Sequence, residues 1–329
     1  MGRCAVGKPY RFFEKNDMEK STNPTGSSAL TTRSFFDFMN TVIEELATTG
    51  HHRTAETYRS TFRSLKEFTG GNDLLLSDIS TLLAHSYESH LREKGVCRNS
   101  SSFYMRIFRA TYNRAVRSGF ITPAVPAPFA GVYTGVDKTA KRAVTLETIS
   151  LIRKLDLSAS PLLAFARDMF LFSFYMRGMS LVDMAYLRKS DLKEGLIGYY
   201  RKKTGRRLFI KMEECMREIV DRYSHPDSPY LLPILSASGE EARRQYLNAS
   251  HLINHKLKEI GKKVGCDIML TMYVARHSWA SAARLKEIPM SVISEGMGHS
   301  SEMITRIYLD SINNTVIDSA NRLILDSIS

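Results

Sequence analysis

The sequence predicts a mainly α-helical fold with a small β-sheet, an α+β fold divided into two domains. Three observations lead to this prediction. Apolar residues recur at helical spacing over residues 34–118 and again over most of residues 146–296. Between these regions, residues 119–142 are rich in proline, glycine and basic side chains. A strand–turn–strand pattern occurs at residues 198–210, and a length of 329 residues suits two domains.

The composition indicates a basic protein with an anionic partner. The chain has 46 Lys and Arg against 34 Asp and Glu, a formal charge of +12 at pH 7. This excess favours nucleic acid as the partner, although charge alone does not identify it. The four cysteines form no CxxC pair, so no zinc-binding motif is expected. No segment resembles a signal peptide or a membrane span, so we expect a cytoplasmic location and no membrane partner.

The first domain is predicted to be a helical bundle over residues 33–118. Residues 1–32 are polar and lack periodicity, so we expect a flexible lead-in there. Glycines follow the predicted helices, which lie at about 34–49, around 58–68, at about 78–94 and at about 99–118. Amphipathic helices joined by such short links pack as a compact bundle.

One face of the predicted helix 99–118 carries arginines and no acidic residue. At 100° per residue these arginines lie at about 0°, −60°, 80° and 20° around the helix axis. They are Arg106, Arg109, Arg114 and Arg117. A solvated face usually mixes both signs of charge, so this face favours contact with phosphates.

The remaining elements belong to a linker and a second domain. Residues 119–142 are predicted to form an extended basic linker that includes Lys141 and Arg142. In the second domain, residues 143–310, helices are expected at about 146–155, 161–178, 212–224, 241–262, 273–285 and 289–296, and at Tyr308. The predicted hairpin carries Arg201, Lys202, Lys203, Arg206 and Arg207, all candidates for DNA contact. Residues 311–329 are predicted to form an amphipathic tail helix.

The most informative pattern lies near the end of the sequence. Arg276 is followed by Gly298-His299, and Tyr308 stands nine positions after His299. Cutting a phosphodiester with a side-chain nucleophile requires an in-line nucleophile, fixed cations around the phosphorane and a proton for the leaving oxygen. Tyrosine, arginine and a hairpin lysine such as Lys203 meet these requirements. The sequence has no cluster of acidic residues, so no metal ion and no other cofactor is predicted.

This order of residues resembles the signature of the tyrosine recombinases, the phage-integrase family, over about residues 33–310. The resemblance implies a helical, SAM-like core-binding domain and a mixed α/β catalytic domain that form a C-shaped clamp on double-stranded DNA. It also implies a homotetramer on two DNA sites and a monomer or weak oligomer when free. No nucleotide cofactor is implied, because the bond energy is kept in a phosphotyrosine. Such an enzyme of mobile DNA would be associated with the nucleoid.

The resemblance implies a role for each matching residue. Tyr308 attacks the scissile phosphate and leaves a 3′-phosphotyrosyl bond and a free 5′-hydroxyl. Arg276 stabilises the phosphorane, and His299 donates a hydrogen bond to a non-bridging oxygen. Lys203 protonates the leaving oxygen.

Two positions depart from the family pattern. Tyr273 stands three residues before Arg276, where the family has a histidine; it can bond a phosphate but is a poor base at pH 7. Ser180 stands where the family has its first arginine. The candidate replacements are Arg177, expected on the same helical face as Ser180, and Arg167.

Two other functions remain open at the level of the sequence. A type IB topoisomerase-like enzyme would use the same chemistry, and a DNA-binding regulator with a decayed active site would account for Ser180 and Tyr273. The sequence does not distinguish integration from excision or inversion, and it does not specify the target DNA. It also leaves open whether the tail packs on its own protomer or on a neighbour.

Overall fold

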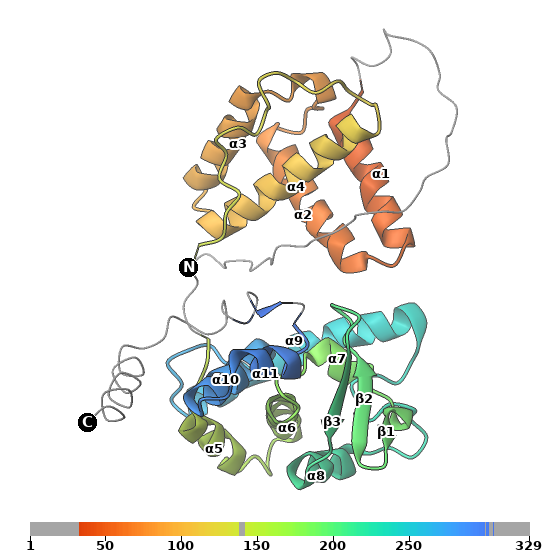
Figure 1. Cartoon of the computed structure of the whole chain (residues 1–329), viewed down its shortest axis with the longest axis vertical. Helices are drawn as coiled ribbons and strands as arrows, with labels where there is room; N and C mark the ends of the chain where they lie inside the picture. The colour runs from red at the N-terminus through yellow and green to blue at the C-terminus, as the bar shows by residue number, and fades with distance from the viewer. Residues whose placement is uncertain (1–32, 138–141, 300, 303–304, 306–329) are drawn as a thin grey trace, which may run out of the picture. The chain divides into compact units, whose positions relative to one another are not determined.

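The computed structural model describes residues 33–137, 142–299, 301–302 and 305. The chain divides into two compact units, Met1–Thr139 and Ala140–Ser329, whose elements are shown in Figure 1. Some of the predictions fall outside the described residues: the lead-in 1–32, Lys141, Tyr308 and the tail helix 311–329. Within the described part, no helix has both the length and the apolar character needed to cross a membrane.

The first unit is helical, and its helices lie where the sequence predicts them. They are α1 (Phe35–Thr48), α2 (His52–Phe68), α3 (Thr81–Glu93) and α4 (Arg98–Arg117), with a 3₁₀ turn η1 (Leu76–Asp78). The Ser34 hydroxyl starts α1 by accepting a hydrogen bond from the Asp37 N–H at 3.1 Å. In the core, the rings of Phe35 and Tyr87 meet Phe108 of α4 edge-on, with centroids 5.2 and 6.0 Å apart.

Residues 120–137, which we call the strap, pack against this helical unit. Phe129 and Val132 of the strap are buried in the same hydrophobic cluster as the helices. The Asn99 side chain of α4 bonds both main-chain groups of Asp137, accepting from its N–H at 2.7 Å and donating to its carbonyl at 3.0 Å. This arrangement differs from the extended linker that the sequence predicts, because apolar side chains between the prolines find a place in the core.

The second unit is built around a buried helix. Its elements are α5 (Leu146–Lys154), α6 (Pro161–Tyr175), α7 (Leu181–Ala185), η2 (Lys189–Asp191), β1 (Leu192–Lys193), β2 (Leu196–Tyr200), β3 (Arg207–Lys211), α8 (Glu214–Tyr223), α9 (Gly239–Lys263), α10 (Met272–Leu285) and α11 (Met290–Gly296). Helix α6 contacts α5, α8, α9 and α10 (Figure 1). Its residues Met169, Phe170 and Phe172 are fully buried, as expected for a helix that is apolar on most of its faces.

The predicted hairpin forms the centre and one edge of a small antiparallel sheet in the order β1-β2-β3. Tyr200 of β2 pairs with Arg207 of β3, and residues 201–206 connect the two strands. Because side chains alternate along a strand, Tyr199 faces inward and is 8% exposed, whereas Tyr200 faces outward and is 66% exposed. The basic connection therefore extends from one end of the sheet (Figure 1).

The helix expected over residues 161–178 ends earlier than predicted. Its last residue is Tyr175, and Arg177 and Gly178 then adopt left-handed conformations with φ of 56° and 72°. The expectation that Arg177 and Ser180 share a helical face is wrong, because Arg177 lies in this turn and Ser180 precedes the first residue of α7.

Candidate active site

Arg276 of α10 is buried and held by main-chain carbonyls. Arg276 is only 5% exposed. Nη1 donates to the Gly178 carbonyl and Nη2 to the Met297 carbonyl, both at 2.7 Å. Carbonyl oxygens carry no net charge, so these bonds fix the guanidinium without neutralising it. Among the described residues no acceptor reaches its buried Nε, a donor of the kind that an incoming anion would satisfy.

His299 follows α11 and contacts Arg276 directly. Its Nε2 lies 2.9 Å from Nη2 of Arg276, and its Nδ1 lies 2.8 Å from Oγ1 of Thr305. An arginine nitrogen cannot accept a hydrogen bond, so Nε2 accepts and Nδ1 carries the proton and donates to Thr305. In this arrangement His299 is a neutral imidazole that orients Arg276. Donation to a phosphate oxygen, the role expected from the sequence, requires the proton to move to Nε2.

Two glycines allow the chain to close around Arg276. A Cβ at Gly178 would lie 2.7 Å from the Arg276 Cα, so α10 approaches this turn more closely than any side chain permits. A Cβ at Gly298 would lie 2.8 Å from Cδ1 of Leu208 and 3.2 Å from Cδ of Arg201. The glycine before His299 therefore lets the hairpin pack against the turn that carries the histidine.

The hairpin brings basic side chains to this turn. Arg201 is 5% exposed, and its Nη1 donates to the Gly298 carbonyl at 2.6 Å. Nη1 of Arg206 donates to the His299 carbonyl at 3.0 Å. Burial lowers the pKa of Lys203, and the charges of Arg201 and then Arg276 lower that pKa further. Lys203 thus lies within the electric field of both arginines while keeping an exposed surface.

A buried carboxylate ties the hairpin to α7. Asp183 is 4% exposed, and its two oxygens accept from the Lys202 N–H at 2.8 Å and from the Ser180 hydroxyl at 2.6 Å. Where the family has an arginine, this chain has Ser180, and its uncharged hydroxyl is a hydrogen-bond partner of Asp183. The contact of Asp183 with the hairpin was not predicted from the sequence, since no local pattern links residues 19 positions apart.

The two candidates for the missing arginine are placed differently. Arg177 is half-buried beside the end of α11, where a Cβ at Gly296 would lie 3.7 Å from its Cδ. Arg167 of α6 donates to the Asp168 carboxylate at 2.8 Å and to the Leu155 carbonyl at 2.7 Å. The carboxylate of Asp168 also joins α6 to α8, so Arg167 belongs to a structural ion-pair network.

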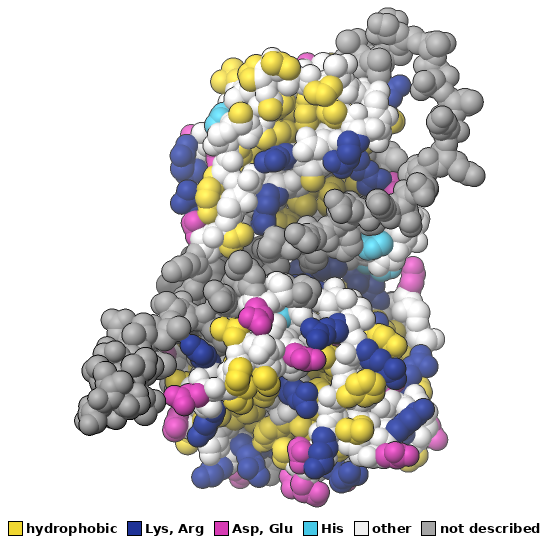
Figure 2. Space-filling view, viewed as in Figure 1, with side chains coloured by type: hydrophobic (Ala, Val, Ile, Leu, Met, Phe, Trp, Pro, Cys, Tyr) yellow, Lys and Arg dark blue, Asp and Glu magenta, His cyan; other side chains and the backbone are white. Residues whose placement is uncertain are grey.

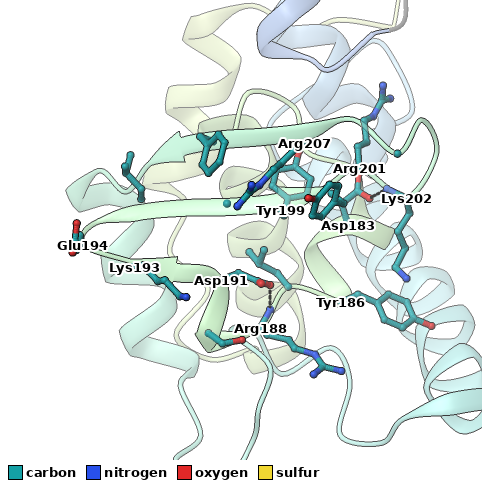
Figure 3. A pocket seen from close by; sticks show the side chains of 17 residues that line it. Asp183, Tyr186, Arg188, Asp191, Lys193, Glu194, Tyr199, Arg201, Lys202 and Arg207 are labelled. Atoms are coloured by element: carbon teal, nitrogen blue, oxygen red, sulfur yellow. Dashed lines mark hydrogen bonds between the residues drawn. The ribbon is translucent and has the colours of Figure 1, made fainter.

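Other predicted site residues point elsewhere. The Tyr273 ring packs edge-on against His277 with centroids 4.5 Å apart, in a small apolar cluster between α10 and α11. Lys202 lies over the Tyr186 ring at 3.7 Å, and Arg207 lies over the Phe209 ring at 4.7 Å. The four residues of these last two contacts line a groove of about 780 Å³ on the outer face of the sheet (Figure 3).

The arginines of α4 are not equivalent in the helical unit. Arg109 and Arg117 are exposed, whereas Arg114 pairs with Glu45 of α1 at 2.5 Å. Arg106 is half-buried, and its Nε donates to the Ser102 carbonyl at 3.4 Å. The sequence showed no acid on this face, because Glu45 reaches it only through tertiary packing.

Basic side chains appear on the viewed face of both units in Figure 2. Arg142, the described basic residue of the predicted linker, is half-buried and precedes Val144, whose N–H donates to the Ser278 hydroxyl at 2.9 Å. In the described residues, no group of three His, Cys, Asp or Glu side chains is placed to hold a metal ion.

Two family models match the chain. Residues 34–127 match the phage integrase SAM-like domain, and residues 157–314 match the phage integrase family. A search of curated proteins gave no match.

The fold of this chain is similar to that of solved integrase structures. The chain is similar to a lambda integrase tetramer bound to a Holliday junction, with 17% identity and a TM-score of 0.64 over 88% of this chain and 82% of that one. It is also similar to the Tn1549 transposon integrase in complex with transposon right end DNA, with 14% identity and a TM-score of 0.63 over 90% of this chain and 100% of that one. At such identities the likeness shows the fold alone. With both family models matched and the fold shared, the chain belongs to the phage integrase family and is a site-specific tyrosine recombinase.

Proposed function

We propose that this recombinase cleaves and rejoins DNA with Tyr308 as the nucleophile and with Arg276, His299 and Lys203 around the scissile phosphate. The observation that supports this most is the buried Arg276 guanidinium, held between two carbonyls and the His299 ring. A fixed charge of this kind stabilises a phosphorane without reorganising during the reaction. Tyr308 follows Thr305, the partner of His299, by three residues in the sequence.

The proposed cleavage step exchanges one P–O bond for another. The Tyr308 oxygen forms a bond to phosphorus as the bond from phosphorus to the 5′-oxygen breaks. The phenolic proton is lost to solvent or a nearby base, and Lys203 gives a proton to the 5′-oxygen. The products are a 3′-phosphotyrosyl bond and a 5′-hydroxyl, and attack by a partner strand's 5′-hydroxyl reverses the step. The sequence-based candidate for a second phosphate-binding arginine is Arg177.

Double-stranded DNA is the proposed partner, and the active assembly is proposed to be a homotetramer on two DNA sites. The net charge of +12 supports DNA binding. The similar lambda integrase was solved as a tetramer on a Holliday junction, which supports the assembly. We propose that the free protein is a monomer or weak oligomer and that it acts in the cytoplasm on nucleoid DNA.

The test of the nucleophile uses Tyr308→Phe and a nicked suicide substrate, from which the released strand diffuses away. The unchanged protein should form a covalent protein–DNA band on a denaturing gel. Tyr308→Phe should bind the same DNA with equal affinity and form no band, because it lacks only the nucleophilic oxygen.

The same gel distinguishes an active recombinase from a DNA-binding regulator with a decayed active site. A covalent band from Tyr308→Phe would assign the nucleophile to another residue. A protein that binds DNA and forms no band in its unchanged form would be a DNA-binding regulator with a decayed site, the alternative that Ser180 keeps open.

A further inference from the structure

Given the proposed function, we infer that Arg201 is a catalytic residue. It supplies the second fixed positive charge at the scissile phosphate, in place of the arginine that Ser180 lacks. The sequence grouped Arg201 with the general DNA contacts of the hairpin, and the structure separates it from them by burial, direction and anchoring.

Arg201 and Arg276 are anchored to consecutive carbonyls of one turn. Nη2 of Arg276 donates to the Met297 carbonyl at 2.7 Å, and Nη1 of Arg201 donates to the Gly298 carbonyl at 2.6 Å. The next residue is His299, which contacts Arg276. The two guanidiniums are therefore held side by side, one from α10 and one from the hairpin, against the segment that carries the catalytic histidine.

Burial distinguishes Arg201 from an ordinary phosphate contact. It is 5% exposed, as is Arg276. An arginine stays charged in a protein, and two of them are buried here beside a lysine and the buried Asp183 carboxylate, so a further anion would balance the excess positive charge. A phosphodiester supplies that negative charge, and its two non-bridging oxygens can each accept a hydrogen bond from the planar guanidinium fork. Burial, and then the charges of Arg201 and Arg276, lower the pKa of Lys203, which agrees with a site shared by the three cationic groups.

Strand alternation explains why Arg201 enters the site whereas Lys202 and Arg207 do not. Tyr199 and Arg201 face inward. Burial and then the Asp183 carboxylate raise the pKa of the Tyr199 hydroxyl, and the charges of Arg276, Arg201 and Arg177 oppose that rise. Lys202 points to the opposite side and covers Tyr186 (Figure 3). Arg207 also lies on the outer face, over Phe209. Arg177 is less enclosed than Arg201 and reaches the region from the turn after α6.

The test compares two substrates that differ by one charge. One carries an ordinary scissile phosphodiester and the other a methylphosphonate, in which a neutral methyl group replaces one non-bridging oxygen. Arg201→Ala should slow release of the 5′-hydroxyl strand from the ordinary substrate by about 100-fold or more. On the methylphosphonate, Arg201→Ala should cleave at nearly the rate of the unchanged protein, because the uncharged group at phosphorus no longer needs the second cation.

Arg167→Ala is the matched control, since it removes a half-buried arginine that pairs with Asp168 away from the turn at residues 297–299. Its deficit, and that of Arg177→Ala, should be the same on both substrates. If Arg201→Ala does not fold, Arg201→Met keeps much of the side-chain volume and should show the same selective recovery.

Two results would overturn the proposal. One is an Arg201 variant whose deficit is absent or equal on both substrates, which assigns Arg201 a structural role or none. The other is selective recovery of Arg177→Ala with no recovery of Arg201→Ala, which assigns the second cation to Arg177. Absence of cleavage by the unchanged protein on the ordinary substrate would instead contradict the proposed function itself.

Discussion

At the scale of single residues, the guanidiniums of Arg201 and Arg276 are bonded to uncharged groups. Main-chain carbonyls hold the guanidiniums of Arg201 and Arg276, and the neutral ring of His299 accepts from Arg276. Burial, and then the charges of Arg201 and Arg276, lower the pKa of Lys203. A lysine with a lowered pKa gives up its proton more readily, which suits a general acid.

Lys203→Ala should therefore slow cleavage of an ordinary substrate by about 10²-fold to 10⁴-fold. A substrate with sulfur in place of the 5′-bridging oxygen should restore the rate, because a thiolate leaves without a proton. Single-turnover release of the 5′ strand measures both rates. Lys211→Ala, an exposed lysine at the far end of the same hairpin, is the control and should behave like the unchanged protein on both substrates.

The pH dependence follows from the direction of the Lys203 pKa shift. Protonated Lys203 is the active form, so cleavage should decline as the pH rises through the lowered pKa. The decline should begin at a lower pH than for a lysine of ordinary pKa, and it should vanish with the sulfur substrate. An identical alkaline decline on both substrates would assign the titration to another group.

At the scale of elements, α4 shows that one helical face can serve two purposes. Arg109 and Arg117 are exposed, whereas Arg114 is paired with Glu45 and Arg106 is bonded within its own helix. Exposed cations without an acidic neighbour are the ones that release counterions on binding DNA. We therefore expect the four arginines to contribute unequally.

Arg109→Ala and Arg117→Ala should each weaken binding to all DNA sequences alike and reduce the log–log salt slope by about 0.9. Arg114→Ala should have a smaller effect, and Glu45→Gln should steepen the slope by releasing Arg114. Fluorescence anisotropy over a series of salt concentrations measures these slopes. Arg53→Ala, an exposed arginine paired with Glu56 on α2, should leave the slope unchanged. A constant slope in the quadruple α4 variant would show that this face is only solvated.

At the scale of the whole molecule, assembly is proposed to depend on the tail. Residues 312–329 lie outside the described residues, but their sequence carries an apolar stripe of Ile312, Val316, Ala320 and Leu323. Burying three or four such side chains supplies on the order of several kcal/mol to a contact. We expect this contact to lie between protomers, as a trans-docked tail would in a tetramer.

Deleting residues 312–329 should leave binding to one DNA site largely intact and abolish complexes that hold two sites. Native gel shifts with one-site and two-site DNA test this. Val316→Glu should reproduce the deletion, whereas Asn314→Glu, which adds the same charge to the opposite helical face, should not. A truncated protein that still forms the four-protomer complex would show that the tail packs on its own protomer.

The sequence by itself determined most of the helices in the described residues, the hairpin, the basic charge and the order of Arg276, His299 and Tyr308. These depend on local periodicity, glycine stops and spacing, which are properties of neighbouring residues. The family assignment rests on the same local patterns, and the family models confirm it.

Only the tertiary structure decided which cations share the site. Arg201 meets Gly298 across 97 positions, and Lys202 meets Asp183 across 19. The sequence also placed Arg177 on a helix that in fact ends at Tyr175, since the close approach of α10 requires the turn there. Contacts between distant segments leave no periodic signal in either segment. The division of one basic hairpin into site cations, Arg201 and Lys203, and outward-facing cations, Lys202 and Arg207, therefore emerged only when its strands were packed against the turn before His299.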